Sequence, residues 1–363
     1  MEIMITSRSD CNPWITHWLK CFKDKGHTLL WVTFGEKKIS EEIHQFLKKE
    51  NIEHIHFPVL SFKRVPIIYE RFKQEVPIFL KRFDVDAVIS GEFFWISTVM
   101  FRMFSTKNFY SYTYENHLNG NLKKYSGIFS KFWIPIVNKI FKGVIVPVRS
   151  TKRCWEKLGL KNIWINPLGV DVKFFRYSEN RLLDELKLLY VGRIIPEKGL
   201  DYLLKATSLL DFPYSLTIAG SGKIEYYSKM AQNLGCNVNF LGQVEYHKLP
   251  KVYQEHNVLI LPSITTPYWK EQLGMVLIEA MATGRIVVGS DSGAIPEVVG
   301  NAGLIVPERS VKALRETLVK IYRDKYIFET LPKKARQRVE KYFDLKKNTS
   351  LLIELMESNL FLH

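Results

Sequence analysis

Apolar and polar positions alternate in a repeated pattern along the chain, and this pattern predicts its architecture. Short apolar runs of strand length are separated by helix-length segments, and strands alternating with helices imply parallel sheets covered on both faces. The strands expected in the first half are residues 3–5, 28–34, 53–57, 85–90, 109–114, 143–146 and 163–165. Those expected in the second half are residues 186–191, 215–219, 238–241, 258–261, 286–289 and 304–306. The helices placed most clearly are residues 13–24, 40–50, 151–158, 200–210 and 345–361.

The length of 363 residues is too great for one ordinary core and suits two domains. The turn-rich stretch NPLGVD around Gly169 is the expected junction. We expect an N-terminal domain over residues 1–168, a second domain over 169–344, and a C-terminal helical segment, 345–363. That helix either closes the second domain or crosses back onto the first. Two doubly wound sheets in tandem are expected to face each other across a cleft, where such folds bind ligands.

Composition indicates a soluble, globular, cytoplasmic protein. Hydrophobic residues make up 46% and charged residues 25% of the chain. The four cysteines form no CxxC pair, so neither a disulfide framework nor a zinc site is expected. The N-terminal MEIMITSRSD is interpreted as a first strand and not a signal peptide. No run approaches the roughly 18 apolar residues of a membrane span.

The positive charge is placed unevenly. Of the net +15, residues 1–170 hold 26 Lys and Arg against 15 Asp and Glu, a net charge of +11. This asymmetry indicates that the first half of the chain interacts with an anionic surface.

Glu279 is an unusual residue for its position. It lies inside the apolar run MVLIEAMA, which Gly284 closes and which predicts a helix buried all round. No Lys or Arg stands three or four residues away, so its partner must come from elsewhere. We infer a polar ligand with hydroxyl donors; the alternative is a core Glu bonded to backbone amides or water.

Three strand-to-helix turns in the second half have the character of anion sites. After residues 186–191 the chain reads GRIIPEKG, where Arg193 and Lys198 precede a helix N-terminus. Free N–H groups and the helix dipole favour negative charge there, and two cations suit a diphosphate. Gly220 in AGSGK and Gly293 in SDSGAIPEVV follow two further strands in the same way. Gly293 lets a backbone come close, and its turn is either a second nest of amides over a ligand or a tight βα turn. All three turns and Glu271 are expected on one edge of one sheet; a solvated loop is the alternative for the basic pair.

Several other motifs are incomplete. AGSGKI is no P-loop because Ile224 stands where Ser or Thr is required, and no GxGxxG follows the first strand. Asp84 and Asp86 form a DxD, but they sit at the entry to a strand and are interpreted as a strand cap. HExxH and GxSxG are absent from the sequence, and no metal site is expected.

Four motifs at the junction and in the second half resemble segments of a known family. VGRIIPEKGLDYLL, EQLGMVLIEAMATG and SDSGAIPEVV, in that order and spacing, resemble retaining GT-B glycosyltransferases of family 4. INPLGVDVKFF is similar to the segment that opens their second domain. The match covers roughly residues 163–310; over the first half only the layout and KDKGHTLLWVTF resemble the family.

The resemblance implies an enzyme that transfers a sugar from a nucleotide-diphosphate sugar, a co-substrate, with no cofactor and no metal. By position, Arg193 and Lys198 would neutralise the diphosphate and Glu279 would bond the ribose hydroxyls. Glu271 would bond the donor sugar, with backbone amides near Gly274 and Met275 and the turn at Gly220 also in the donor site. The configuration at the anomeric carbon would be retained by same-face attack.

The first domain departs from the family pattern. The loop after the first strand reads SRSD instead of carrying the usual Gly-Gly, and Ala294 replaces the second Gly before IPE. The candidates for contact with the reacting carbon are Glu115, Asn116 and His117, and each of them is equally interpretable as a strand cap.

A basic, aromatic stretch follows these residues. KKYSGIFSKFWIPIVNKIFK interleaves Lys with Phe, Trp and Ile. Lys124, Lys131 and Lys142 are expected near one side of a helix, although Pro135 would kink that helix or set its start. Lys123, Lys124, Lys131 and Lys142 are the expected contacts with an anionic membrane, through which a peripheral enzyme on the inner face would reach a glycan or lipid-linked acceptor. A buried helix with solvated lysines is the alternative.

Three other functions remain open from the sequence. A sugar-nucleotide epimerase of the same architecture is disfavoured by the Glu-x7-Glu spacing. A non-catalytic sugar-nucleotide module is disfavoured because Arg193, Lys198, Glu271 and Glu279 are all present. A nucleic-acid binder is suggested by the high pI, but no RRM, KH or zinc-finger signature occurs, so no nucleic-acid partner is expected.

Overall fold

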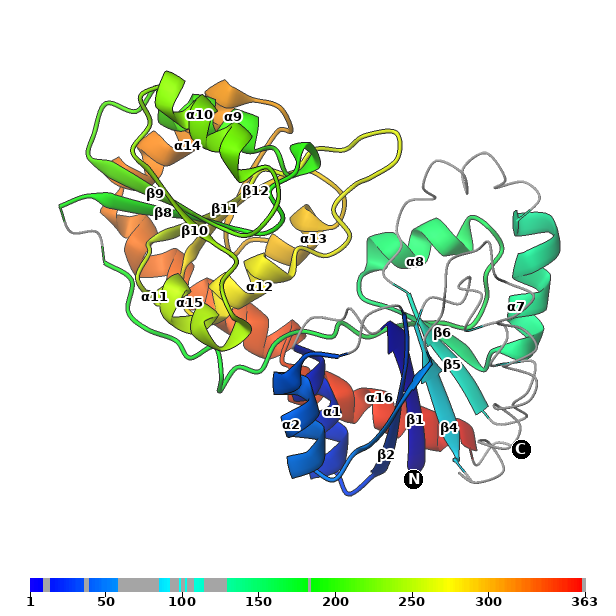
Figure 1. Cartoon of the computed structure of the whole chain (residues 1–363). Coiled ribbons are helices and arrows are strands. Elements are labelled where there is room, and N and C mark those ends of the chain that lie inside the picture. The colour runs from blue at the N-terminus through cyan, green and yellow to red at the C-terminus, as the bar shows by residue number, and fades with distance from the viewer. Residues whose placement is uncertain are drawn as a thin grey trace. The chain divides into compact units, whose positions relative to one another are not determined.

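The computed structural model describes residues 1–8, 14–35, 39–57, 85–91, 98, 102, 108–113, 129–181 and 184–360. These residues form two compact units, each with its own parallel sheet and helices (Figure 1). The first unit contains the described residues up to Leu168 and, in addition, the segment from Leu345 onward; the second runs from Gly169 to Asp344. The predicted α/β class with two Rossmann-like domains is confirmed.

The sheet of the first unit has the order β3-β2-β1-β4-β5-β6-β7, and all of its described strand pairs are parallel. The strands are β1 (Glu2–Arg8), β2 (Thr28–Phe34), β3 (Glu53–Phe57), β4 (Ala87–Ser90), β5 (Asn108–Tyr112), β6 (Gly143–Val146) and β7 (Ile163–Ile165). The described helices are α1 (Trp14–Asp24), α2 (Glu41–Lys49), the π-helix η2 (Phe129–Trp133), α7 (Ile134–Ile140), α8 (Arg149–Glu156) and α16 (Leu345–Leu360).

The sheet of the second unit has the order β10-β9-β8-β11-β12-β13, again with parallel pairs. The strands are β8 (Leu186–Val191), β9 (Tyr214–Ala219), β10 (Val238–Gly242), β11 (Val258–Leu261), β12 (Ile286–Ser290) and β13 (Leu304–Val306). The helices are η3 (Pro196–Lys198), α9 (Leu200–Thr207), α10 (Ile224–Asn233), η4 (Tyr246–Lys248), α11 (Leu249–Gln254), α12 (Met275–Ala282), α13 (Ile295–Val299), α14 (Val311–Arg323) and α15 (Lys325–Tyr342). Figure 1 shows α9, α10 and α14 on one face of this sheet and α11, α12 and α15 on the other.

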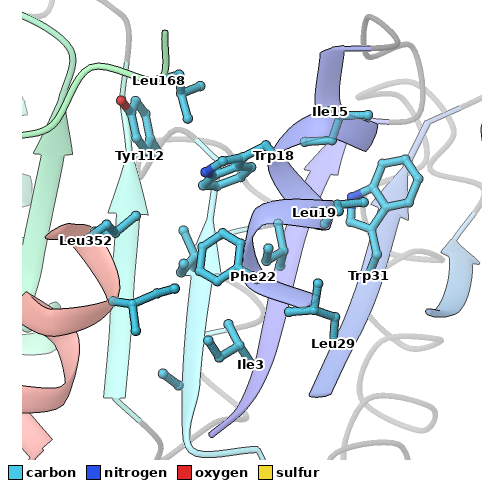
Figure 2. Close-up of a cluster of buried hydrophobic side chains, with 14 of the residues drawn as sticks. Ile3, Ile15, Trp18, Leu19, Phe22, Leu29, Trp31, Tyr112, Leu168 and Leu352 are labelled. Carbon is cyan, nitrogen blue, oxygen red and sulfur yellow. The ribbon is translucent and has the colours of Figure 1, made fainter. Parts of the chain in front are cut away.

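The core of the first unit lies between α1, the sheet and α16 (Figure 2). Ile15, Trp18, Leu19 and Phe22 recur at helical spacing on α1, and all four are buried. The Trp18 ring contacts Phe22 with ring centroids 5.4 Å apart. Leu352 of α16 belongs to the same cluster, so α16 completes the core of the unit that begins the chain.

The second unit buries its helices as the sequence pattern predicts. Leu200, Leu203, Leu204 and Thr207 form the buried stripe of α9. α12 is buried at every residue from Leu277 to its end at Ala282, because it packs against β12 on one side and α15 on the other. A helix covered on two sides needs apolar residues all round, which is the pattern of MVLIEAMA.

Some predicted boundaries were wrong by a few residues. α8 begins at Arg149 and ends at Glu156, because the chain turns at Leu158 and Gly159 before β7. α9 ends at Thr207 instead of Leu210, and Leu209 is exposed. The predicted strand 109–114 is β5, which begins and ends earlier.

The basic, aromatic stretch forms a shorter helix than predicted. Pro135 lies in the first turn of α7 and so sets its start. Lys142 lies beyond the end of α7, where its backbone N–H donates to Phe109 O at 2.9 Å, so the expectation that it shares a helix side with Lys131 was wrong. Lys123 and Lys124 lie outside the described residues.

Asp86 of the DxD pair precedes β4, and its Oδ2 accepts a hydrogen bond from the backbone N–H of Glu2 at 2.8 Å. This contact joins the amino ends of two neighbouring strands, so the predicted strand-cap role fits Asp86, while Asp84 lies outside the described residues. In the part of the chain that the structure describes, no helix combines the length and apolar character that crossing a membrane requires.

Candidate functional site

The loops after β8 and β11 lie at the topological switch point of the second sheet. β8 pairs with β9 on one side and with β11 on the other, all in parallel, so the carboxyl ends of these strands meet at one edge. Open α/β sheets bind ligands in the crevice at such a point. Lys198 ends η3 in the loop after β8, and Glu271 lies in the loop after β11. Lys198 and Glu271 therefore lie on the sheet edge where the sequence predicts them.

Lys198 and Glu271 are in direct contact. The Lys198 Nζ lies 2.6 Å from the Glu271 Oε2, and both side chains are largely buried, 12% and 8% exposed. The Ser263 hydroxyl donates to the same oxygen at 2.7 Å, and Ser263 is fully buried. Charge-assisted bonds of this length are the stronger kind. The pair is a fixed cation and carboxylate at the point where a ligand would enter.

Trp269 lies beside this pair. The Lys198 ammonium is 5.2 Å from the centre of the Trp269 ring, within the range of a cation–π contact. The Trp269 carbonyl accepts a hydrogen bond from the Thr266 N–H at 2.8 Å, which closes a tight turn. Thr265 anchors the base of this turn, because its backbone N–H donates to Glu308 Oε2 at 2.6 Å. The loop that bears Glu271 is thereby held in a defined conformation.

Gly293 brings a second loop against Glu271. Its φ is +56°, and a Cβ at this position would lie 1.9 Å from the Glu271 carbonyl oxygen. The neighbouring Ala294 N–H donates to that same carbonyl at 3.1 Å. The close backbone approach that the sequence indicated at Gly293 is therefore made by the Glu271 segment itself, which fixes the carboxylate through its backbone.

Gly220 joins the loops after β8 and β9. A Cβ at Gly220 would lie 1.8 Å from the Gly192 carbonyl oxygen, and the Gly220 N–H donates to the Gly242 carbonyl at 2.7 Å. Next to this contact, the Arg193 carbonyl accepts a hydrogen bond from the Tyr190 hydroxyl at 2.6 Å. The Arg193 backbone is thus fixed at the sheet edge, while the residue itself is exposed.

Gly274 provides the start of α12. It has a left-handed conformation, with φ +75° and ψ 55°, and as the N-cap residue it makes no side-chain cap bond. The first N–H groups of an α-helix have no partner within the helix, so those of Met275 and Val276 are backbone donors at this helix start. These donors and the positive dipole end lie a few residues beyond Glu271 along the chain.

Glu279 lies further along α12 and is buried, 5% exposed. Its Oε2 accepts a hydrogen bond at 2.6 Å from the hydroxyl of Tyr253 on α11. Burial raises the pKa of Glu279 to about 7, an effect that the bond from Tyr253 partly offsets. No salt bridge to Glu279 occurs within the described ranges. The partner that the structure gives Glu279 is thus a protein hydroxyl from another helix, and the ligand with hydroxyl donors stays a prediction.

An aromatic cluster surrounds the Tyr253–Glu279 contact. The Tyr253 ring lies 6.0 Å from that of Phe175, which in turn lies 5.8 Å from Tyr246. Tyr246 stacks on Phe174 at 5.5 Å with an interplanar angle of 16°. Burial raises the pKa values of both tyrosines, and the nearby Glu279 carboxylate adds to the rise. Both phenols are therefore neutral hydrogen-bond donors at ordinary pH.

The structure brings together some of the predicted residues and leaves others aside. Lys198 and Glu271 touch, and Gly293 lies against Glu271. Glu115, Asn116 and His117 lie outside the described residues, so their roles stay predictions. Sequence reasoning missed Ser263, Trp269 and Tyr253. Ser263 and Trp269 could have been found from their place between β11 and Glu271, whereas no sequence signal pointed to Tyr253.

Comparison with known proteins places the chain in a family. Residues 171–358, more than half of the chain, match the model of Glycosyl transferases group 1. A phosphatidyl-myo-inositol mannosyltransferase from Mycolicibacterium smegmatis is 31% identical over 226 residues, which cover 56% of this chain and 57% of that protein. The aligned part of the chain spans about half the length of the curated relatives it matches.

Solved structures share the fold across the whole chain. A glycosyltransferase from Rickettsia africae has a TM-score of 0.81 at 16% identity, covering 100% of this chain and 99% of its own. Anabaena Alr3699/HepE, solved in complex with UDP and glucose, has a TM-score of 0.77 at 15% identity, covering 99% and 100%. At these identities the likeness shows the fold, which is GT-B. With the family model matched over more than half of its length, the chain belongs to the glycosyl transferases group 1 family.

Proposed function

We propose that this chain is a retaining glycosyltransferase of family 4 that transfers a sugar from a nucleotide-diphosphate sugar to an acceptor hydroxyl, without a metal ion. The observation that carries the proposal is the buried contact between Lys198 and Glu271 at the switch point of the second sheet. There a cation that can bind phosphate lies beside a carboxylate that can bind sugar hydroxyls, and α12 starts at Gly274, a few residues beyond Glu271.

The diphosphate would bind at Lys198 and Arg193. A Lys ammonium has three N–H donors, and the contact with Glu271 uses one of them. The remaining donors can bond phosphate oxygens without breaking that contact. Arg193 is exposed on the same edge, and its planar guanidinium can grip phosphate through two donors. The backbone N–H groups of Gly274 and Met275, and the turn at Gly220, would line the same site.

The ribose would bind at Glu279. A buried carboxylate is costly unless it is hydrogen-bonded, and among the described contacts only the Tyr253 hydroxyl reaches it. Two vicinal hydroxyls of a ribose are donors that would satisfy the remaining acceptor sites. Support also comes from a fold neighbour of this chain, the Anabaena protein solved with UDP and glucose.

The transfer itself would be a same-face displacement. The bond from the anomeric carbon to the leaving phosphate oxygen breaks, and a bond to the acceptor oxygen forms on the same side of the ring. The leaving phosphate oxygen takes the proton of the acceptor hydroxyl, so no separate base is required. Lys198 and Arg193 would stabilise the charge that develops on the diphosphate, and Glu271 would hold the donor sugar. Glu115, Asn116 and His117 remain the proposed contacts of the reacting centre.

The acceptor is proposed to be a membrane- or envelope-linked glycan or glycolipid. The exposed side of η2 and α7 supports this choice, because Phe132 and Ile136 are 62% and 45% exposed there. Lys131 and Lys139, both exposed, flank these apolar side chains. An apolar helix face bordered by lysines suits an anionic membrane surface. The similar Mycolicibacterium protein acts, by its name, on phosphatidyl-myo-inositol, which is a membrane lipid.

A screen of sugar nucleotides for thermal stabilisation tests the proposal. UDP-glucose, UDP-galactose, UDP-N-acetylglucosamine, GDP-mannose and ADP-glucose form the panel. At about 100 times its Kd, a true donor should raise Tm by roughly 5 °C or more. The variant Glu279→Gln should lose this stabilisation, and Glu316→Gln, an exposed carboxylate on α14, is the matched control that should keep it.

The stabilising sugar nucleotide is then used in transfer reactions. The anomeric configuration of the product, read by NMR, tests retention. If no member of the panel stabilises the protein, or if the product is inverted, the corresponding part of the proposal is wrong.

A further inference from the structure

The hydrogen bond between Tyr253 and Glu279 joins two side chains that are both removed from solvent. Tyr253 is fully buried, and its hydroxyl donates to the Glu279 Oε2 at 2.6 Å. Tyr253 lies on α11 and Glu279 on α12, so the bond crosses from one helix to the next. The position of this carboxylate is therefore set by a residue of a different element.

The Tyr253 ring is itself held in place. It packs edge-on against Phe175. The guanidinium of Arg336 donates to the Phe175 carbonyl and to the carbonyl of Ala282, the last residue of α12, both at 2.8 Å. Phe175 is thus tied to the same helix that bears Glu279. The phenol and the carboxylate belong to one rigid assembly, in which a rotation of either side chain would break a buried contact.

The bond uses one of the two carboxylate oxygens. A carboxylate has two oxygens and about four acceptor sites. Tyr253 occupies a site on Oε2, and the described contacts give Oε1 no protein donor. A carboxylate anchored through one oxygen keeps the other in a fixed direction, which is the requirement for recognising a pair of neighbouring hydroxyls.

We propose that Tyr253 is a positioning residue for the nucleotide-sugar donor, because it fixes one oxygen of Glu279 and presents the other to the vicinal hydroxyls of the ribose. This inference rests on the proposed function and adds to it a residue outside the four motifs that carry the resemblance. Tyr253 does not touch the donor itself; it acts through the carboxylate.

The same contact gives the site a defined pH response. Among the residues that the structure describes, the titratable groups that face Glu279 are Tyr253 and Tyr246, and Asp171 in turn lies near Tyr246. Both tyrosines stay neutral because burial raises their pKa values, so Glu279 is the group that titrates near neutrality. An ionised carboxylate accepts ribose hydroxyls better than a protonated one. Donor affinity should therefore rise with pH through the pKa of Glu279.

The test compares the wild type with Tyr253→Phe, using the sugar nucleotide that stabilises the wild type most in the panel above. The Kd is measured by calorimetry over a range from about pH 6 to about pH 9. Near neutral pH the variant should bind about tenfold more weakly, the size expected when a bond to a charged group is lost. Because the Tyr253 bond lowers the pKa of Glu279, the midpoint of the pH dependence should also move to higher pH in the variant.

Tyr227→Phe is the matched control. Tyr227 is another buried phenol of the second unit, and its hydroxyl donates to a carboxylate, that of Asp201, at 3.3 Å. This variant should leave both Kd and its pH midpoint unchanged. A general loss of packing would weaken both variants alike, whereas positioning of Glu279 predicts an effect only in Tyr253→Phe.

Making the Tyr253 substitution in a Glu279 variant distinguishes the roles of the two residues. In Glu279→Gln, whose side chain cannot ionise, the additional change Tyr253→Phe should produce no pH shift and a smaller loss of affinity than in the wild type. Equal Kd values and midpoints for wild type and Tyr253→Phe would overturn the inference while leaving the donor assignment intact. Failure of every sugar nucleotide to bind the wild type would instead overturn the proposed function.

Discussion

The ammonium of Lys198 lies 2.6 Å from the Glu271 carboxylate, although 73 positions separate the two residues in the sequence. The contact exists because β8 and β11 are neighbours in the sheet, while β9 and β10 lie on the far side of β8. Two residues with separate expected roles, one for phosphate and one for sugar, are therefore a single structural unit.

Breaking this pair should destabilise the fold as well as weaken donor binding. In Lys198→Met the Glu271 carboxylate would remain buried without its cation, which typically costs about 3–5 kcal/mol. The double variant Lys198→Met with Glu271→Gln should be less destabilised than Lys198→Met alone, because no buried charge is left unpaired. Urea unfolding of the wild type, the single variants and the double variant measures the coupling. Additive losses would mean that the two side chains do not interact in solution.

Glu279→Gln should gain stability as the pH rises, relative to the wild type. Burial raises the folded-state pKa of Glu279 to about 7 from the ordinary value of 4.5. The folded protein thus binds a proton more tightly than the unfolded chain, so the contribution of Glu279 is greatest below about pH 4.5 and is lost as pH rises through about pH 7. The full loss is on the order of 3 kcal/mol.

Urea unfolding at about pH 5 and about pH 8 checks this prediction. The wild type should lose stability relative to Glu279→Gln over that interval. A parallel pH dependence of the two proteins would show that the carboxylate is not desolvated in solution. The same variant should bind the donor more weakly, by about 1.5–3 kcal/mol, since a charged hydrogen-bond partner is lost.

Transfer activity should survive EDTA. In the proposed site the diphosphate charge is met by Lys198, Arg193 and the backbone N–H groups at the start of α12. Loss of activity in EDTA, followed by recovery with manganese, would instead direct attention to Asp84 and Asp86.

Replacing the exposed Arg193 by Ala should change the free energy of unfolding by no more than about 0.5 kcal/mol while weakening donor binding.

The protein should float with liposomes that contain phosphatidylglycerol. Each Lys near an anionic surface contributes about 1 kcal/mol, and the contact should weaken at high salt. Replacing Lys131 and Lys139 by Glu, together with Phe132→Ser, should abolish flotation and leave the donor Kd unchanged.

The control for flotation makes the same charge change elsewhere. Lys251→Glu with Lys312→Glu alters two exposed lysines of the second unit, 82% and 85% exposed. This variant should float like the wild type. Equal loss of flotation in both variants would assign the effect to total charge. Absence of flotation in the wild type would contradict the membrane proposal.

The strands were predictable because each is a short apolar run bounded by polar turns. Thr28–Phe34, Leu186–Val191 and Val258–Leu261 have the predicted bounds. The helix around Glu279 was equally predictable, since an apolar run of eight residues that ends near a glycine is typical of a buried helix.

The partners of the site residues were less accessible to sequence reasoning. That Glu279 requires a partner follows from its apolar neighbours, but the partner lies on α11, where Tyr253 is one aromatic among many in the chain. The contact of Lys198 with Glu271 depends on the order of strands in the sheet, which local patterns do not specify. Lys142 was misplaced because the end of a short helix is set by tertiary contacts more than by propensity.

The path of the chain through the two units has a consequence for its synthesis. α16 supplies Leu352 and Met356 to the core that begins with β1 and α1, so this core is assembled from segments on both sides of the second unit. On the ribosome, chains lengthen by about 5–20 residues per second. The face of α1 that contacts α16 therefore remains exposed while the whole of the second unit is translated. A chain interrupted before Leu345 would leave that apolar face without its cover, which makes such a fragment a ready substrate for chaperones and proteases.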